Sequence, residues 1–165
     1  VWILMKAQKK TNVLRLLDKA HIAYEAFEYN ISDGKTDAVS VAQKLQVPVN
    51  TVYKTLVTMS DGPSYFVFII PAASTLNLKA AAHAAGVKSL EMLPQAKLLP
   101  LTGYVHGGCS PIGMKKPFPT FLDTSAQNLP SFFVSAGKVG INVRLSPKDL
   151  SDYIGASFAP VSNPV

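Results

Sequence analysis

Two strand-like segments joined by a tight polar turn place the strongest constraint on the fold. Residues 52–59 and 64–70 are rich in β-branched and aromatic side chains, and Ser60-Asp61-Gly62-Pro63 separates them. This pattern predicts an antiparallel hairpin with a polar loop. The chain is therefore expected to contain a β-sheet around which its other elements pack.

Length and composition indicate one globular domain. The chain has 165 residues, of which 48% are hydrophobic and 16% charged, so disordered and fibrous classes are excluded. A compact α/β or α+β fold is expected. The longest apolar run, 65–73, is strand-length and contains Pro71, whereas a membrane helix needs roughly 20 apolar residues. We therefore expect a soluble protein with no membrane contact.

Hydrophobic periodicity and turn residues predict the remaining elements. Helices are expected at residues 11–20, 37–45 and 76–85, in a turn or two at 94–99, and from 146 or 147 to about 155. Further strands are expected at residues 23–29, 87–92, 120–122, 131–135 and 141–145. Residues 136–140 should form a hairpin loop, and the tail after residue 155 should fray. The domain is expected to span 5–160, and residues 1–4 are interpreted as a remnant that precedes a natural start at Met5.

A glycine-rich stretch at residues 102–116 is the leading candidate for a binding loop. Gly107 and Gly108 lack a Cβ, so main-chain N–H groups can approach an oxyanion closely. Pro111 stiffens the loop, and Lys115 with Lys116 adds positive charge. The alternative is an ordinary turn, because glycine-rich segments often have no further function.

Lys54 and Tyr29 each allow two interpretations. Strand alternation puts Lys54 on the face of Val52 and Leu56, where it is either an edge-strand lysine that discourages aggregation or an ammonium held at a cleft. Tyr29 ends a predicted strand, and a core position is favoured over a ligand contact.

The sequence offers no metal, cofactor or nucleophile motif. His21, His83 and His106 lack ligand spacing, and phosphate-loop and dinucleotide-binding fingerprints are absent. We expect no metal and no cofactor. Cys109 has no evident orienting acid and is better interpreted as a packed apolar residue; Ser110 likewise has no identifiable base.

Charge and cysteine content bear on partners and compartment. The net charge of +6 favours polyanionic partners such as RNA, although surface lysines often only interact with solvent. A single cysteine cannot form an intramolecular disulfide, and no secretory signal precedes the first helix. A cytoplasmic protein is expected.

Several motifs together resemble the YbaK/EbsC family of aminoacyl-tRNA deacylases, which is related to the editing insertion domain of bacterial prolyl-tRNA synthetase. The resemblance extends over residues 10–158. It rests on Tyr29, Val-Tyr-Lys-Thr-Leu-Val at 52–57, Leu-Asn-Leu-Lys at 76–79, Thr-Gly-Tyr-Val-His-Gly-Gly-Cys-Ser-Pro-Ile-Gly at 102–113 and Val-Ser-Ala-Gly-Lys-Val-Gly at 134–140. It implies a single domain with a mixed, barrel-like β-sheet flanked by helices. It also implies hydrolysis of a mischarged aminoacyl-tRNA, with Cys-tRNA(Pro) as the first candidate substrate.

The resemblance assigns residue roles. Lys54 would be the essential lysine, and Gly107 and Gly108 would give main-chain N–H groups to the substrate carbonyl. The remaining implied substrate-site residues are Tyr29, Thr55, Ser110, Pro111, Ser135 and Asn142. Apart from the resemblance, Lys115, Lys116 and Lys138 are candidates, with Lys54, for an RNA-binding patch around the site; the alternative is that Lys115 and Lys116 simply face solvent. Strand alternation points Thr55 away from Lys54, so a bulge or the Thr55 main chain would have to make its contact.

Two departures from the family pattern leave the amino-acid specificity open. Asn142 stands where family members carry an aspartate, and Thr36-Asp37 lies in a shorter loop where they carry an aromatic residue. An amide cannot offer a carboxylate to the substrate α-amino group. An Ala-tRNA(Pro) deacylase and a non-catalytic module that binds an RNA 3′ end or an aminoacyl adenylate therefore remain alternatives. Prolyl-tRNA synthetase is the implied protein partner.

Overall fold

The computed structural model describes residues 5–7, 10–62 and 64–164. Residues 1–4 lie outside the described residues. The α-helices are α1 Asn12–Lys19, α2 Ala38–Leu45, α3 Leu78–Ala85, α4 Leu98–Thr102 and α5 Pro147–Ile154. The 3₁₀ turns are η1 Val49–Thr51, η2 Gln95–Lys97 and η3 Thr124–Ala126. The strands are β1 Met5–Lys6, β2 Glu25–Glu28, β3 Tyr53–Met59, β4 Tyr65–Pro71, β5 Glu91–Met92, β6 Thr120–Asp123, β7 Phe132–Lys138, β8 Ile141–Leu145 and β9 Ser157–Ala159.

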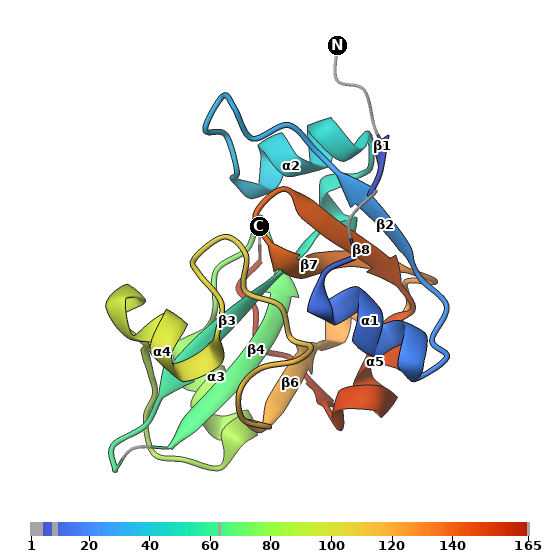
Figure 1. Cartoon of the computed structure of the whole chain (residues 1–165). Coiled ribbons are helices and arrows are strands. Elements are labelled where there is room, and N and C mark those ends of the chain that lie inside the picture. Colours follow the sequence, from blue (N-terminus) through green and yellow to red (C-terminus); the bar gives the residue numbers. More distant parts are fainter. Residues whose placement is uncertain (1–4, 8–9, 63, 165) are drawn as a thin grey trace.

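The described strands form two sheets, so the mixed α/β fold is confirmed without a closed barrel (Figure 1). One sheet has the antiparallel order β1-β2-β8-β7. The other has the order β5-β3-β4-β6-β9, and its predicted β3–β4 hairpin is antiparallel. β6 pairs in parallel with β4, and β9 pairs in parallel with β6. A single bridge between Val52 and Phe133 connects the two sheets.

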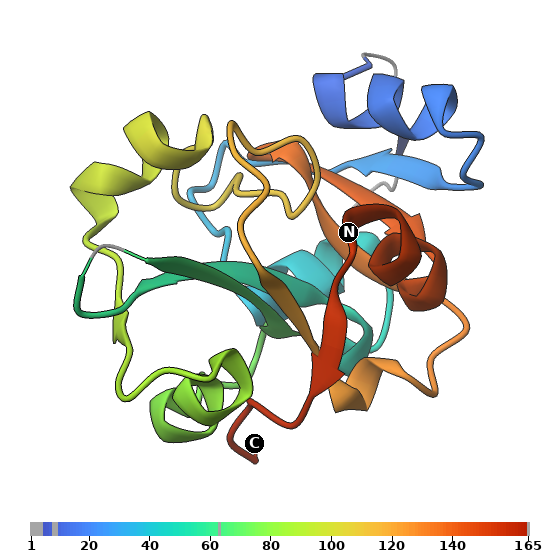
Figure 2. The same ribbon diagram turned by 90° about the horizontal axis from the view of Figure 1, so that it is seen from below.

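The β3–β4 hairpin is covered on both faces. Figure 2 shows α3 below these strands, with α4 and the glycine-rich loop above them. Alternation along β4 sends Phe68 and Ile70 toward Ala81 and Ala82 of α3, whereas Val67 packs with Cys109 of the loop. Burial on both faces explains the nearly continuous apolar run of β4.

Residues 155–164 are ordered, contrary to the prediction of a frayed tail. β9 pairs with β6, and the buried carboxylate of Asp123 accepts hydrogen bonds from the main-chain N–H groups of Val161 and Ser162, both at 3.0 Å. The predicted hairpin loop at 136–140 was also too long, because β7 continues to Lys138 through an irregularity in its pairing with β8. The predicted strand at 87–92 is reduced to β5.

None of the described helices has the length and apolar character needed to cross a bilayer.

Candidate functional site

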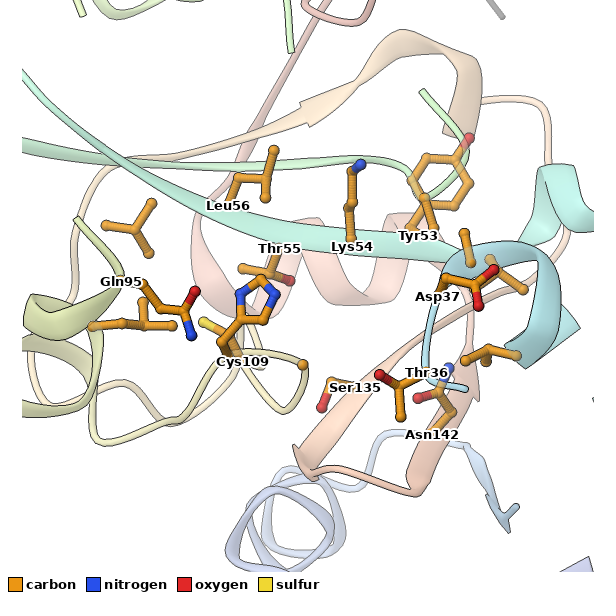
Figure 3. Close-up of a pocket in the computed structure, with 18 of the residues that line it drawn as sticks. Thr36, Asp37, Tyr53, Lys54, Thr55, Leu56, Gln95, Cys109, Ser135 and Asn142 are labelled. Atoms are coloured by element: carbon orange, nitrogen blue, oxygen red, sulfur yellow. The ribbon is translucent and has the colours of Figure 1, made fainter. Parts of the chain in front are cut away.

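A cavity of about 520 Å³ lies where the two sheets meet, beside β3, the start of α2 and the glycine-rich loop (Figure 3). The predicted site residues that line it are Tyr29, Lys54, Thr55, Gly107, Ser135 and Asn142. The predicted residues outside its lining are Gly108, Ser110, Pro111, Lys115, Lys116 and Lys138. The cavity thus brings together predicted residues that lie far apart in the sequence. The other predicted residues lie outside its lining and do not form its wall.

Lys54 and Thr55 point to opposite faces of β3. Lys54 pairs with Ile70 and Thr55 with Ile69, with no shift in register along the β3–β4 ladder. Lys54 and Leu56 therefore lie on one side of the strand, while Thr55 lies on the side of Cys109 (Figure 3). The alternation predicted from the sequence is confirmed, and no bulge redirects Thr55.

The outer edge of β3 is open beside both residues. β5 pairs only with Thr58 and Met59, and the Leu93 N–H bonds the Val57 carbonyl at 3.0 Å. Within the described residues, no strand covers this edge from Lys54 to Leu56. A single cavity can therefore contact side chains from both faces of β3, together with main chain along its edge.

The Lys54 ammonium is a partly desolvated cation. It has no hydrogen bond or ion pair with any residue that the structure describes, and burial lowers its pKa. A cation that has lost water without gaining a counterion binds an anionic group favourably. Its position therefore suits a phosphate or a polarised ester oxygen.

The Thr55 hydroxyl is also poised for a ligand. Its Oγ1 atom is buried and has no hydrogen-bond partner among the described residues. A buried hydroxyl without a partner costs about 1–3 kcal/mol, which a polar ligand group can recover.

The two loop glycines have different roles. Gly107 adopts a positive φ of 85°, and its N–H has no hydrogen-bond partner in the described chain, so it is available to an oxyanion. The Gly108 N–H instead bonds the Val105 carbonyl at 3.0 Å. A Cβ on Gly108 would lie 3.0 Å from the Val139 nitrogen, so this residue allows close packing against the β7–β8 turn. The Gly108 N–H is thus already bonded within the protein, and of the two predicted amides only Gly107 stays a candidate for substrate contact.

Ser110 and Pro111 shape the loop from behind. Both are buried, and the Ser110 hydroxyl accepts a hydrogen bond from the Ile112 N–H at 3.3 Å. This supports a turn-stabilising role for Ser110 rather than direct substrate contact.

Cys109 lines the cavity as a neutral thiol. It is 7% exposed, packs with Val57 and Val67, and burial raises its pKa to about 12. At neutral pH almost none of it is thiolate, so it is unsuited to nucleophilic attack.

β7 and β8 supply the opposite wall of the cavity. Ser135 and Asn142 pair across these strands, and the Ser135 hydroxyl accepts a hydrogen bond from the Gly137 N–H at 3.1 Å. Asn142 is 6% exposed, yet its amide has no hydrogen-bond partner in the part of the chain that the structure describes. It can donate to and accept from a ligand. Burial raises the pKa of Tyr29, so its phenol stays protonated.

Further residues line the cavity beyond the predicted set, among them Thr36, Asp37 and His106. The adjacent Gly107 was a signal for His106, and the helix N-cap position was a signal for Asp37. Among the described residues, no three His, Cys, Asp or Glu side chains are grouped as metal ligands.

Comparison with known proteins identifies the family. The model for the aminoacyl-tRNA editing domain matches residues 33–153. The chain belongs to the aminoacyl-tRNA editing domain family. A relative of this editing domain is EbsC of Enterococcus faecalis, a proposed Cys-tRNA(Pro)/Cys-tRNA(Cys) deacylase. The two are 40% identical over 157 residues, which is 95% of this chain and 96% of EbsC.

Two further comparisons relate the editing domain to prolyl-tRNA synthetase. The proline–tRNA ligase of Burkholderia orbicola is 25% identical over 123 residues, which is 72% of this chain but only 21% of the ligase. The crystal structure of a proposed trans-editing enzyme for prolyl-tRNA synthetase matches with a TM-score of 0.80 at 23% identity. That match covers 94% of this chain and 100% of the other, so the whole fold of the editing domain is shared.

Proposed function

We propose that the chain is a trans-editing hydrolase that deacylates mischarged aminoacyl-tRNA, with Cys-tRNA(Pro) as the preferred substrate. The observation that carries this proposal is the 40% identity with EbsC along nearly the full length of both chains. The cavity supports it, because free polar groups from three separate segments, β3, the glycine-rich loop and β8, converge beside an open strand edge. The proposed compartment is the cytoplasm, and the proposed protein partner is prolyl-tRNA synthetase.

In the proposed mechanism the protein positions the substrate ester and supplies no nucleophile of its own. The Gly107 N–H would stabilise the oxyanion that develops on the ester carbonyl, and Lys54 would bind the phosphate of the 3′-terminal adenosine. The thiol of a cysteinyl ester would attack its own carbonyl. A C–S bond would form, the bond from the carbonyl carbon to the ribose oxygen would break, and the thiol proton would pass to that oxygen. The released thiolactone would then hydrolyse in water.

Two alternatives rest on specific features. An alanyl ester has no thiol, so its hydrolysis would use a water bound in the cavity, and the absence of a carboxylate at Asn142 leaves this specificity open. A non-catalytic module would use the same Lys54 and loop to hold an RNA 3′ end or an aminoacyl adenylate without turnover.

The test is deacylation of Cys-tRNA(Pro), Ala-tRNA(Pro) and Pro-tRNA(Pro) by the purified protein. Rapid loss of the cysteinyl ester alone is the expected result. Preferential loss of the alanyl ester would favour the second deacylase, and persistence of all three esters with retained binding would favour the module.

The tRNA acceptor stem is expected to contact lysines outside the cavity. Lys115, Lys116 and Lys138 are exposed, and the main chain of Lys138 packs against Gly108 of the loop. We expect tRNA affinity to fall steeply with added salt, and the triple variant with alanine at these positions to have a salt slope shallower by about 2–3. Filter binding from low to high salt measures both slopes. An unchanged slope in the triple variant would show that these lysines do not contact the RNA.

A further inference from the structure

The cavity carries two charged side chains of opposite sign. Among the described residues that line it, Asp37 is the carboxylate and Lys54 is the lysine. An aminoacylated RNA 3′ end also carries both signs close to its ester, namely the α-ammonium of the amino acid and the phosphate of the terminal nucleotide. Complementary charges at the two ends of a binding site fix the orientation of a ligand.

Asp37 is held in place by the helix that it begins. It is the N-cap of α2, where its Oδ2 accepts the Ser40 N–H at 3.2 Å and its Oδ1 accepts the Ser40 hydroxyl at 2.6 Å. These bonds lower the pKa of Asp37, so the carboxylate is charged at neutral pH. A carboxylate has about four acceptor positions, and the two bonds from Ser40 leave others for a ligand.

Asn142 provides an independent sign of a ligand at this end of the cavity. It is 6% exposed, and its amide has no hydrogen-bond partner among the described residues. Figure 3 places Asn142 and Thr36 beside each other, with Asp37 next along the same wall. Its amide atoms are not fully enclosed by protein, so they are open to the cavity and can bond a ligand there.

We propose that Asp37 is the anionic anchor for the α-ammonium of the substrate, with the Asn142 side-chain oxygen as a second acceptor. The proposal rests on the proposed function and deepens it. The ligand class is a primary amine next to an acyl group, and an N-acylated amino acid would lose the ion pair.

The experiment measures binding rather than turnover, so that it does not depend on catalysis. The probes are two non-hydrolysable amides, 3′-deoxy-3′-(L-alanylamino)adenosine and its N-acetyl derivative. Wild type is expected to bind the free amine roughly 2- to 5-fold more tightly, because Asp37 is exposed and solvent weakens an ion pair there. Asp37→Asn should bind both probes equally, because asparagine keeps the helix cap but not the charge.

Asp61→Asn is the matched control, because Asp61 is an exposed carboxylate in the β3–β4 turn and lies outside the cavity lining. It should retain the wild-type preference. Equal binding of both probes by wild type, no binding of either, or an unchanged preference in Asp37→Asn would each overturn the proposal. If the protein keeps its preference for the free amine but does not hydrolyse tRNA esters, the result would count against the proposed hydrolase function alone.

Discussion

Replacing Lys54 with alanine is expected to lower kcat/KM for deacylation of Cys-tRNA(Pro) by about 100-fold or more. The change removes a partly desolvated ammonium that has no protein partner among the described residues, so a bound phosphate loses its charge-assisted hydrogen bond. Such bonds contribute about 1.5–3 kcal/mol, which corresponds to one to two factors of ten in rate, and misplacement of the ester adds to the loss. Single-turnover deacylation of the labelled substrate measures the effect.

Cys109→Ala is the control within the same cavity. Because burial keeps the Cys109 thiol protonated, this variant should deacylate Cys-tRNA(Pro) within about twofold of wild type. An inactive Cys109→Ala that still folds would refute the mechanism in which the substrate thiol attacks. A fully active Lys54→Ala would refute the role of Lys54. Thermal unfolding of both variants distinguishes these outcomes from loss of the fold.

Local sequence patterns predicted most of the secondary structure because the signals were themselves local. The turn at residues 60–63 and the alternation on either side of it gave the β3–β4 hairpin, and the same alternation placed Lys54 and Thr55 on opposite faces. The predicted helix starts at residues 37 and 146 coincide with the N-caps of α2 and α5, Asp37 and Ser146. Each of these inferences needs only a few neighbouring residues.

The features that sequence reasoning missed depend on long-range contacts. The open edge of β3 exists because β5 pairs with only two of its residues, and no local signal fixes the length of that pairing. The ordered tail depends on Asp123, which lies nearly 40 residues earlier in the chain. The Gly108 amide was assigned to substrate because its bond to Val105 could not be predicted from glycine content.

Lys44 is a buried cation that the sequence pattern did not single out. Its side chain is 1% exposed, and its Nζ donates hydrogen bonds to the carbonyls of Asn30 and Lys35, both at 2.7 Å, and to Asp33 Oδ1 at 2.8 Å. It also lies 5.9 Å from the centre of the Tyr29 ring, which lines the cavity. One ammonium thus fixes the loop that leads from β2 to the cavity wall at Thr36.

Lys44→Met is expected to lower the free energy of unfolding by about 2 kcal/mol. Methionine fills a similar volume but removes the donor to two carbonyls and to Asp33, and a lost hydrogen bond from a charged group costs about 1.5–3 kcal/mol. The lower part of this range applies because the Asp33 side chain is 25% exposed and keeps its bond from the Lys35 N–H at 3.0 Å. Urea unfolding followed by circular dichroism measures the change, and Lys148→Met is the matched control. Lys148 is 81% exposed and pairs with Asp152 one helical turn away, so its loss should leave the free energy of unfolding nearly unchanged.

Acid titration separates the charge of Lys44 from its packing. The hydrogen bond from Lys44 lowers the pKa of Asp33 in the folded state, so this carboxylate stabilises the fold above its usual pKa. That contribution is lost as the pH falls through the lowered value. The difference in unfolding free energy between wild type and Lys44→Met should therefore narrow below about pH 4, where Asp33 becomes protonated. A difference that stays constant with pH would mean that Lys44 holds the loop through its two carbonyl contacts alone.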